Sequence, residues 1–187
     1  MNISLVKPFS IGNVIFKNYT QLLIDEKKQV LEFRNHFLVR EMMHNKEEIK
    51  LSDHLCFINK LSSDEKNCYW VVIRKNKLVG SVYLNEINCK EKSAFWGIFL
   101  HPNYIGTGIG VEIQYESMKL FFETLKFKTI LAEALKVNRD TLSIQSKFLF
   151  ESIEETADCF LMKLEKNQWS KLSTTTFKEF KRKIILK

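Results

Sequence analysis

The chain has 187 residues, of which 45% are hydrophobic and 27% are charged, and its net charge is +7. This length suits one domain with a single core and is short for two. No run of about 18 apolar residues occurs, which excludes a membrane-spanning helix. The N-terminal stretch lacks the charged start and apolar run of a secretory signal. We therefore expect a cytoplasmic globular protein.

The positive charge is concentrated near the C-terminus, at Lys178, Lys181, Arg182, Lys183 and Lys187. Such a run is typical of a solvated helix face, and no nucleic-acid-binding motif accompanies it. A positive bias also suits a protein whose ligands carry phosphates. The four cysteines have no metal-binding spacing. We expect free thiols, no metal site and no nucleic-acid partner.

The first half of the chain predicts both strands and helices. Short runs of β-branched and aromatic residues indicate strands, and apolar residues at helical spacing indicate helices. In chain order these are a strand at 13–16, helices at 25–37 and from 51 onward, and strands at 69–73 and 78–84. The polar turn 74–77 between the last two strands predicts a hairpin.

The second half begins with a nearly all-apolar strand at 93–100, a pattern typical of a strand buried on both faces. An amphipathic helix is predicted at 109–126. A strand at 129–135, a short helix at 139–147 and a strand at 159–164 follow. This order predicts one α+β domain over 1–167. The remaining residues, 168–187, are expected to form a basic C-terminal tail that is helical.

The most informative segment is Leu100–Gly110, which joins the apolar strand to the long helix. It contains three alternating glycines, Gly106, Gly108 and Gly110. Without Cβ atoms, backbone N–H groups can approach a phosphate closely, and a helix N-terminus adds free N–H groups and a positive dipole end. A P-loop would need Gly-Lys-Ser/Thr, and a dinucleotide-binding turn would lie early in a βαβ unit. The segment therefore predicts a different kind of phosphate-binding turn.

The strand, the Gly-x-Gly turn and the helix resemble the acetyl-CoA pyrophosphate loop of the GNAT acetyltransferases. The family pattern is Gln/Arg-x-x-Gly-x-Gly/Ala, and this chain has Ile105 at the first position of that pattern. The resemblance implies a mixed, mostly antiparallel sheet, splayed into a V around acetyl-CoA and flanked by helices. The implied acetyl-CoA contacts are Ile98, Phe99, Leu100, Ile105, Gly106, Thr107, Gly108, Ile109, Gly110 and Asn138.

A second resemblance involves residues 32–43 and 52–58 and extends over roughly 20–165. It points to the GNAT branch that acetylates amino-sugar nucleotides. That branch is typified by the UDP-4-amino-4,6-dideoxy-N-acetyl-β-L-altrosamine N-acetyltransferase of pseudaminic acid biosynthesis, which supplies a sugar for flagellin glycosylation. An arginine can hold a phosphate bidentately, and an aromatic ring can stack on a base or sugar. The implied substrate contacts are Arg34, Asn35, His54, Tyr83, Asn85 and Phe95.

Acetyl transfer by direct attack requires a base for the amine and a proton for the departing thiolate. The candidates for the base are Glu86, Ser81 acting through a water, and His101. The family pattern places a tyrosine acid seven residues after Asn138, but this chain has Gln145 there. A glutamine side chain forms hydrogen bonds but is not an acid. A proton from solvent, or one relayed by Ser143 or Ser146, is the alternative.

Two other functions stay open. The chain could acetylate a protein N-terminus or a small amine with the same cosubstrate. It could also be a catalytically weakened protein that binds acetyl-CoA and a partner, as the missing tyrosine and the basic tail would allow. A homodimer is an open arrangement.

Overall fold

A computed structural model describes residues 5–185, and its centre is an eight-stranded sheet in the order β1-β2-β3-β4-β5-β6-β8-β7. All neighbouring strands run antiparallel except β5 and β6, which are parallel. The predicted α+β class with a mixed, mostly antiparallel sheet is confirmed. The strands are β1 (Phe9–Ile11), β2 (Val14–Asn18), β3 (Cys68–Arg74), β4 (Lys77–Asn88), β5 (Ser93–Leu100), β6 (Thr129–Leu135), β7 (Glu151–Glu155) and β8 (Cys159–Glu165).

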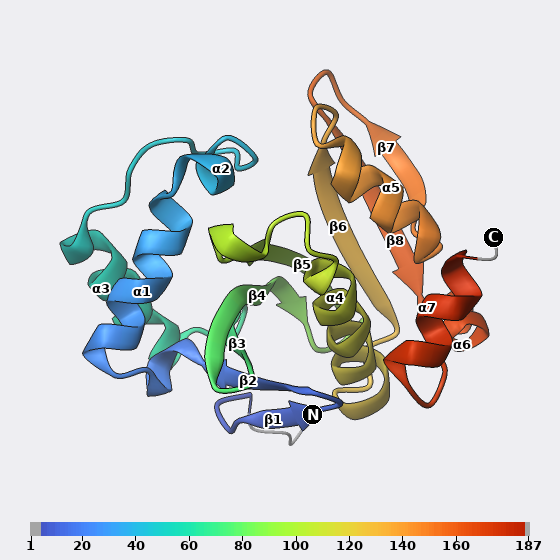
Figure 1. Ribbon diagram of the computed structural model, residues 1–187, viewed down its shortest axis with the longest axis horizontal. Helices are drawn as coiled ribbons and strands as arrows, with labels where there is room; N and C mark the ends of the chain where they lie inside the picture. Colours follow the sequence, from blue (N-terminus) through green and yellow to red (C-terminus); the bar gives the residue numbers. More distant parts are fainter. Residues whose placement is uncertain (1–4, 186–187) are drawn as a thin grey trace.

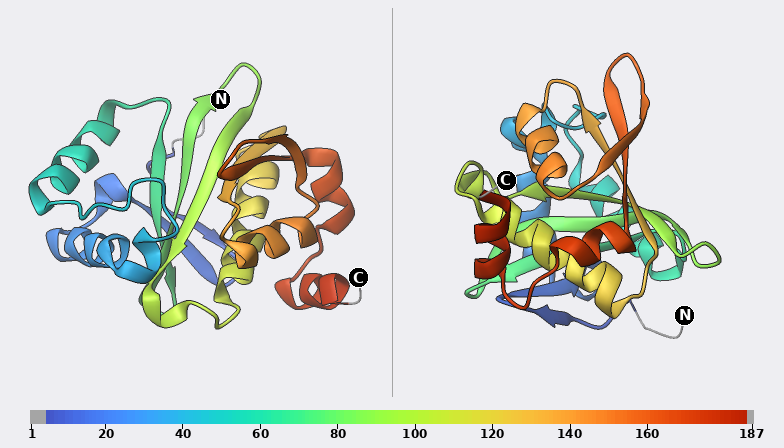
Figure 2. Two further views of the ribbon diagram at one scale, coloured as in Figure 1. Left: turned by 90° about the horizontal axis from the view of Figure 1, so that it is seen from above. Right: turned by 90° about the vertical axis from the view of Figure 1, so that its right-hand side faces the viewer.

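Helices cover both faces of the sheet (Figures 1 and 2). One face carries α1 (Ile24–Asn35), α2 (Phe37–Arg40) and α3 (Leu51–Lys60). The other face carries α4 (Ile109–Lys119), α5 (Arg139–Lys147), α6 (Lys166–Leu172) and α7 (Phe177–Ile185). Short 3-10 turns lie at Tyr19–Gln21, Leu61–Ser63 and Pro102–Tyr104, and a π-helical turn at Leu120–Thr124 continues α4. Among residues 5–185, no helix has the length and apolarity needed to cross a membrane.

Strands β3 and β4 form the predicted hairpin. Lys75 and Asn76 both have positive φ, 48° and 58°, as a tight two-residue hairpin turn requires. The alternation along β4 then places Val82 in the core beneath α4, while Tyr83 packs against the second core, beneath α1 and α3. The sheet therefore separates a large core on the α4 side from a smaller one on the α1–α3 side.

Three predicted boundaries differ from the structure. The helix predicted at 25–37 ends at Asn35, because His36 is extended (ψ 136°) and its Nδ1 accepts a hydrogen bond from the Leu38 N–H, which starts α2. Strand β1 pairs with β2 and was not predicted. Strand β7 was also missed, because its sequence ESIEE is exposed throughout and shows no apolar alternation.

The segment predicted as a C-terminal tail forms α6 and α7 and is packed onto the domain. Trp169, Leu172, Phe180 and Ile184 belong to the same buried cluster as Phe121. The basic side chains Lys178, Lys181 and Arg182 are exposed on the outer face of α7. The domain thus continues past residue 167, because the apolar side of the amphipathic helix α7 packs against α4. Lys187, part of the predicted basic run, lies outside the described residues.

Strands β5 and β6 pair over only part of their length, and this positions the site. Paired positions run from Ser93↔Thr129 to Trp96↔Ala132, whereas β5 continues to Leu100 and β6 to Leu135. Beyond the last pair the two strands diverge, and β6 continues beside β8 instead (Figure 1). The predicted V-shaped splay is confirmed, and within residues 5–185 the backbone edge of β5 past Trp96 has no partner strand on that side.

One buried carboxylate on α4 predicts a pH dependence of stability. Glu116 is 2% exposed, its Oε2 has no hydrogen-bond partner among the described residues, and it lies against Gly12 in the β1–β2 turn. Burial raises the pKa of Glu116 to about 7, opposed by Lys119 and reinforced by Glu112 and Glu123. Because the folded pKa exceeds the unfolded one, the fold favours the protonated form, and stability falls as pH rises from about 4.5 to about 7.

Replacing Glu116 with glutamine is expected to raise Tm at pH 8 by about 4–8 °C, as ~2 kcal/mol of charge burial is removed. The difference from the unmodified protein is expected to shrink toward pH 5, where the carboxyl is protonated in the fold. Thermal unfolding followed by circular dichroism across pH 5–8 measures both. A pH-independent gap between the two proteins would contradict this account.

Candidate active site

The glycine turn between β5 and α4 has the geometry of an anion site. Gly106 and Gly108 adopt left-handed conformations with φ 77° and 81°, and a Cβ on either would meet nothing within 4 Å. The N–H groups of Gly106, Gly108, Ile109 and Gly110 donate to no backbone acceptor in the described part of the chain. Gly108 is the N-cap of α4, so these donors lie at the positive end of the helix.

The side chains of the turn have other contacts and do not add to its anion-binding groups. Ile105 is exposed, Ile109 is buried in the core, and the Thr107 hydroxyl donates to the Tyr104 carbonyl at 2.7 Å. A phosphate bound here would therefore contact main-chain groups. Such binding would not require the Gln or Arg that the family pattern has at the position of Ile105.

The predicted contacts on β5 lie past its last pair with β6. Ile98 and Leu100 pack against the core beneath α4, while Phe99 belongs to the core beneath α1 and α3. Their backbone groups on the β6 side lack a neighbouring strand. The residues present thus fit an extended thioester-bearing ligand that pairs with β5 and ends at the glycine turn.

A cavity of about 570 Å³ lies on the α1–α3 side of the sheet. We call it the acceptor pocket. Aromatic and other apolar side chains supply most of its wall, and Asp53 is its one carboxylate. It is lined by Tyr19, Val30, Arg34, Met43, His44, Asn45, Ile49, Asp53, His54, Phe57, Tyr69, Tyr83, Asn85 and Phe99. Four predicted substrate contacts, Arg34, His54, Tyr83 and Asn85, are brought together here.

Two of these side chains carry buried polar atoms without a partner. Arg34 donates from Nη2 to the Asn45 carbonyl at 2.9 Å, but its Nη1 and the Asn85 Oδ1 have no hydrogen-bond partner among the described residues. Burial lowers the pKa of Arg34. Leaving such atoms unpaired is costly, so a ligand that pairs them gains affinity. Both hydrogens of Nη1 are therefore available to a ligand, and Nη2 donates one of its two to Asn45.

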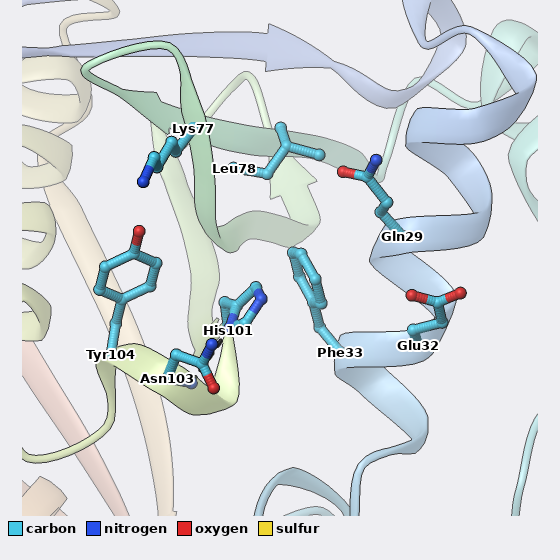
Figure 3. A pocket seen from close by; sticks show the side chains of 8 residues that line it. All are labelled: Gln29, Glu32, Phe33, Lys77, Leu78, His101, Asn103 and Tyr104. Atoms are coloured by element: carbon cyan, nitrogen blue, oxygen red, sulfur yellow. Dashed lines mark hydrogen bonds between the residues drawn. The ribbon is translucent and has the colours of Figure 1, made fainter.

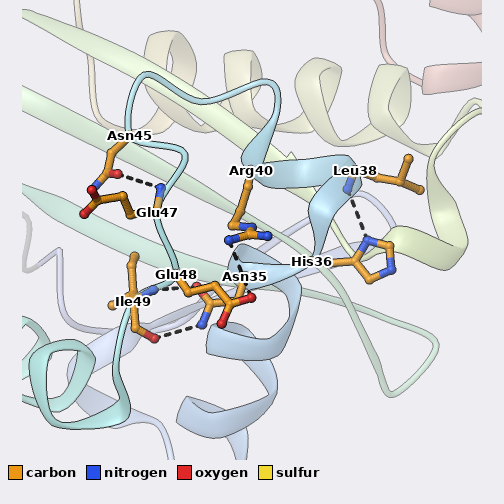
Figure 4. Close-up of polar contacts among 8 residues, drawn as sticks. All are labelled: Asn35, His36, Leu38, Arg40, Asn45, Glu47, Glu48 and Ile49. Atoms are coloured by element: carbon orange, nitrogen blue, oxygen red, sulfur yellow. Dashed lines mark hydrogen bonds and ion pairs between the residues drawn. The ribbon is translucent and has the colours of Figure 1, made fainter.

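Residues 41–50, between α2 and α3, contribute Met43, His44, Asn45 and Ile49 to the lining of the acceptor pocket. Figure 4 shows the hydrogen bonds that join this segment to Asn35 of α1. Asn35 does not line the pocket. Its side chain instead holds this segment through hydrogen bonds with Ile49, accepting from N–H at 2.9 Å and donating to the carbonyl at 2.8 Å. At the far end, His44 contacts Glu133 of β6 at 3.1 Å. The segment therefore reaches across the splay from α1 to β6.

The ring of His54 is held in place by α1. Its Nε2–H donates to the Lys27 carbonyl at 3.1 Å, and burial lowers its pKa. A neutral ring in this tautomer leaves Nδ1 as an acceptor. His54 thus offers a hydrogen-bond acceptor, not a charge.

The predicted bases are placed apart from one another. Ser81 is fully buried: it donates to the Trp70 carbonyl at 3.0 Å and accepts from the Tyr19 hydroxyl at 2.6 Å. Glu86 is exposed on a bulge of β4 with φ 52° and lines neither pocket described here. Neither side chain is directed into the acceptor pocket.

His101 lies in a second, smaller hollow of about 320 Å³ between α1, the start of β4 and the segment before the glycine turn (Figure 3). Its ring packs on Phe33 at 4.2 Å between centroids, and its Nδ1 accepts from the Asn103 N–H. This is the role of a residue that ends β5 and shapes the following turn. It does not line the acceptor pocket.

The remaining predicted residues have structural contacts. Asn138 is the N-cap of α5 and accepts from the Thr141 N–H at 3.1 Å. Gln145 is 3% exposed and accepts from Gln114 Nε2 of α4 at 2.9 Å, so it points into the core. Phe95 faces the same side as Tyr83 but lines neither pocket.

Residues that sequence reasoning missed include Tyr19 and Tyr69. The Tyr69 ring stacks on Tyr83 at 5.0 Å between centroids, and Tyr19 packs on Tyr69 at 5.5 Å. Tyr69 and Tyr83 are direct partners across β3 and β4. The hairpin turn alone would have paired Tyr69 with Val82, because a bulge between Val72 and Ile73 shifts the register by one residue, so no signal in the sequence pairs the two tyrosines.

Comparison with known proteins agrees with this geometry. The model of the acetyltransferase (GNAT) domain family matches residues 21–151. The acetyltransferase PseH of Campylobacter jejuni (strain 81-176) is 29% identical over 144 residues, covering 77% of this chain and 88% of that protein.

Two solved structures illustrate the shared fold. The C. jejuni N-acetyltransferase PseH in complex with acetyl coenzyme A is 25% identical, with a TM-score of 0.67, and covers 81% of this chain and 98% of the other. The spermidine N-acetyltransferase of Vibrio cholerae in complex with CoA and spermine has a TM-score of 0.76 at 18% identity, covering 84% and 98%. The open glycine turn, the splayed strands and a family match over most of its length place this chain in the GNAT acetyltransferase family.

Proposed function

We propose that this protein transfers the acetyl group of acetyl-CoA to the amine of a nucleotide-activated amino sugar, a UDP-4-amino-4,6-dideoxy sugar. The reaction would belong to pseudaminic acid or related surface-glycan biosynthesis. Similarity to proteins named PseH supports the acetyl-CoA chemistry. The acceptor class is supported chiefly by one observation, the unpaired buried Nη1 of Arg34 in the acceptor pocket.

Acetyl-CoA supplies the acetyl group as a thioester. The free N–H groups of the glycine turn and α4 would bind its diphosphate, and the open edge of β5 would pair with its amide-bearing arm. The acetyl end would then lie at the fork of β5 and β6, beside the acceptor pocket. These contacts orient the thioester without any charged side chain of the turn.

The charge of the pocket favours an anionic acceptor over a polyamine. A polyamine carries several positive charges and is stabilised by carboxylates, but Asp53 is the one carboxylate in the wall and Arg34 faces the same space. A sugar nucleotide carries phosphates that pair with Arg34 Nη1, and hydroxyls that pair with Asn85 Oδ1 and His54 Nδ1. The rings of Phe57 and Tyr69 offer apolar faces for the sugar.

Replacing Arg34 with alanine is expected to raise KM for the nucleotide sugar about 10- to 100-fold, because a charge-assisted hydrogen bond contributes roughly 1.5–3 kcal/mol. The Kd for acetyl-CoA is expected to stay within about twofold. Release of CoA with purified protein, acetyl-CoA and a panel of acceptors measures the first, and calorimetry measures the second.

The panel pairs each UDP-4-amino sugar with the same amino sugar lacking the nucleotide, and adds spermidine and a peptide N-terminus. Arg182→Ala, which removes an exposed guanidinium on α7, is the matched control. Equal efficiency with and without the nucleotide, or preferred turnover of spermidine or peptide, would contradict the proposed acceptor. Acetyl-CoA binding with no turnover of any amine would favour a binding protein.

A further inference from the structure

At position 145 the family pattern has a tyrosine that protonates the leaving thiolate. This chain has Gln145 there, which cannot act as an acid. Gln145 is buried and hydrogen-bonded to Gln114 between α5 and α4. Ser143 and Ser146 are exposed on α5 and do not line the acceptor pocket. A proton for the departing sulfur must come from another group or from water.

Tyr83 lies where such a group would have to be. It pairs directly with Gly97 across β4 and β5. A Cβ added at Gly97 would lie 2.2 Å from both the hydroxyl oxygen and Cζ of Tyr83, so the end of the tyrosine ring occupies the space that any other side chain would fill. Gly97 is the first residue of β5 past its last pair with β6, Trp96↔Ala132. The Tyr83 hydroxyl therefore lies at the fork of the splayed strands, on the side of the acceptor pocket.

This hydroxyl is available to a ligand. Tyr83 lines the acceptor pocket, and its hydroxyl has no hydrogen-bond partner among residues 5–185. By contrast, Tyr19 donates to Ser81, Tyr115 donates to the Thr174 carbonyl, and Tyr104 lies in the separate hollow beside His101. The remaining tyrosine, Tyr69, stacks against Tyr83 and supports its ring.

The surroundings keep the hydroxyl protonated. Burial raises the pKa of Tyr83 to about 12, and the nearby Tyr69 and Glu133 act in the same direction, while Arg34 opposes them. At neutral pH the group is therefore a proton donor with its proton in place.

We propose that Tyr83 is a catalytic residue that donates its hydroxyl proton to the sulfur leaving the thioester, in place of the tyrosine that α5 lacks. The inference rests on the proposed function for its acyl donor but not for the identity of the acceptor. As the amine nitrogen forms its bond to the carbonyl carbon, the carbon–sulfur bond breaks and its electron pair goes to sulfur. Tyr83 gives its proton to that sulfur and recovers one from the new ammonium nitrogen through water. The net change is one proton moved from nitrogen to sulfur.

Tyr83→Phe is the informative variant, because it keeps the ring over Gly97 and against Tyr69 while removing the hydroxyl. Its kcat is expected to fall about 100-fold with the best acceptor, in the range of a lost general acid. Its acetyl-CoA Kd is expected to stay within about threefold. Tyr115→Phe, which removes a buried hydroxyl far from the fork, is the control and is expected to keep kcat. A kcat for Tyr83→Phe within threefold of the unmodified protein would overturn the proposal.

A second measurement needs no acceptor. The unmodified protein is expected to bind CoA about fivefold more tightly than desulfo-CoA, the value of one hydrogen bond of ~1 kcal/mol between the hydroxyl and sulfur. Tyr83→Phe is expected to lose that preference, whereas a purely structural role for the ring would leave it unchanged. Equal CoA-to-desulfo-CoA ratios in the two proteins would refute contact with the sulfur. If no nucleotide sugar is turned over, the proposed acceptor fails, but this comparison still decides the role of Tyr83.

Discussion

Replacing Gly108 with tryptophan is expected to weaken acetyl-CoA binding at least ~1000-fold. The left-handed turn presents unpaired N–H groups around an open space in which a Cβ at Gly108 meets nothing within 4 Å. A large side chain would occupy that space and exclude the diphosphate. Losing two charge-assisted hydrogen bonds costs about 4 kcal/mol, which corresponds to this change in Kd. Calorimetric titration with acetyl-CoA measures it.

The control for this experiment separates exclusion from backbone strain. Any non-glycine residue at φ 81° costs about 1–2 kcal/mol of stability, so Gly108→Ala and Gly108→Trp are expected to lower Tm by similar amounts. Only the tryptophan fills the phosphate space, so the alanine variant is expected to lose much less affinity. If both variants bind acetyl-CoA as the unmodified protein does, the turn is a connection between β5 and α4 and nothing more.

Replacing Trp169 with alanine is expected to destabilise the protein by about 3–5 kcal/mol. The indole is 1% exposed, packs near Phe122 at 6.2 Å and Tyr115 at 5.7 Å between centroids, and donates from Nε1 to Glu123 at 3.2 Å. Its removal leaves a cavity beneath α6 and α7, and Glu123 Oε1 loses one of its two hydrogen bonds and keeps the one from Ser173 Oγ. Urea unfolding at fixed pH measures the free energy of unfolding.

Ser170→Ala, one position along the exposed side of α6, is the matched control and is expected to change stability by less than about 0.5 kcal/mol. A loss below about 1 kcal/mol for Trp169→Ala would mean that residues 166–185 contribute little to the core of the domain. The expected loss would make them part of the acetyltransferase domain.

The nearness of the two proposed binding regions follows from one property of the sheet. Strand β5 pairs with β4 along its length but leaves β6 after Trp96. Past Trp96, the unpaired edge of β5 runs toward the glycine turn. Gly97, the first residue of this unpaired part, lies beneath the ring of Tyr83. A single strand thus connects the proposed phosphate-binding turn to the proposed catalytic residue Tyr83, which is why changes at Gly108 and Tyr83 are expected to affect binding and turnover separately.

Local patterns in the sequence were sufficient for the elements nearest the cosubstrate. The apolar run of β5, the alternating glycines and the start of α4 are all determined over a few residues, because φ preference and helix initiation are local properties. The hairpin of β3 and β4 was also predictable from its polar turn. Strand β7 was not, since all five of its residues are exposed and its only evidence is pairing with β8.

The sequence indicated several of the residues that line the acceptor pocket, but it did not indicate which polar side chains are already hydrogen-bonded elsewhere. Arg34, His54, Tyr83 and Asn85 do meet in one pocket. By contrast, the Ser81 hydroxyl is already hydrogen-bonded to Tyr19 and Trp70. The Gln145 side chain is hydrogen-bonded to Gln114. A side chain's reactivity depends on whether its polar atoms are already paired, and those partners lie 11 to 62 residues away in the chain.

The sequence by itself determined the order of the elements apart from β1 and β7, and the glycine turn before α4, because these depend on short-range backbone preference and apolar periodicity. Its resemblance to a known pattern indicated the family. Only the tertiary structure decided that the last two helices complete the core, that residues 41–50 reach β6, and that Tyr83 lies over Gly97 at the fork of the sheet. These outcomes depend on strand register and on helices packing against distant surfaces, and both are set by contacts between residues far apart in the chain.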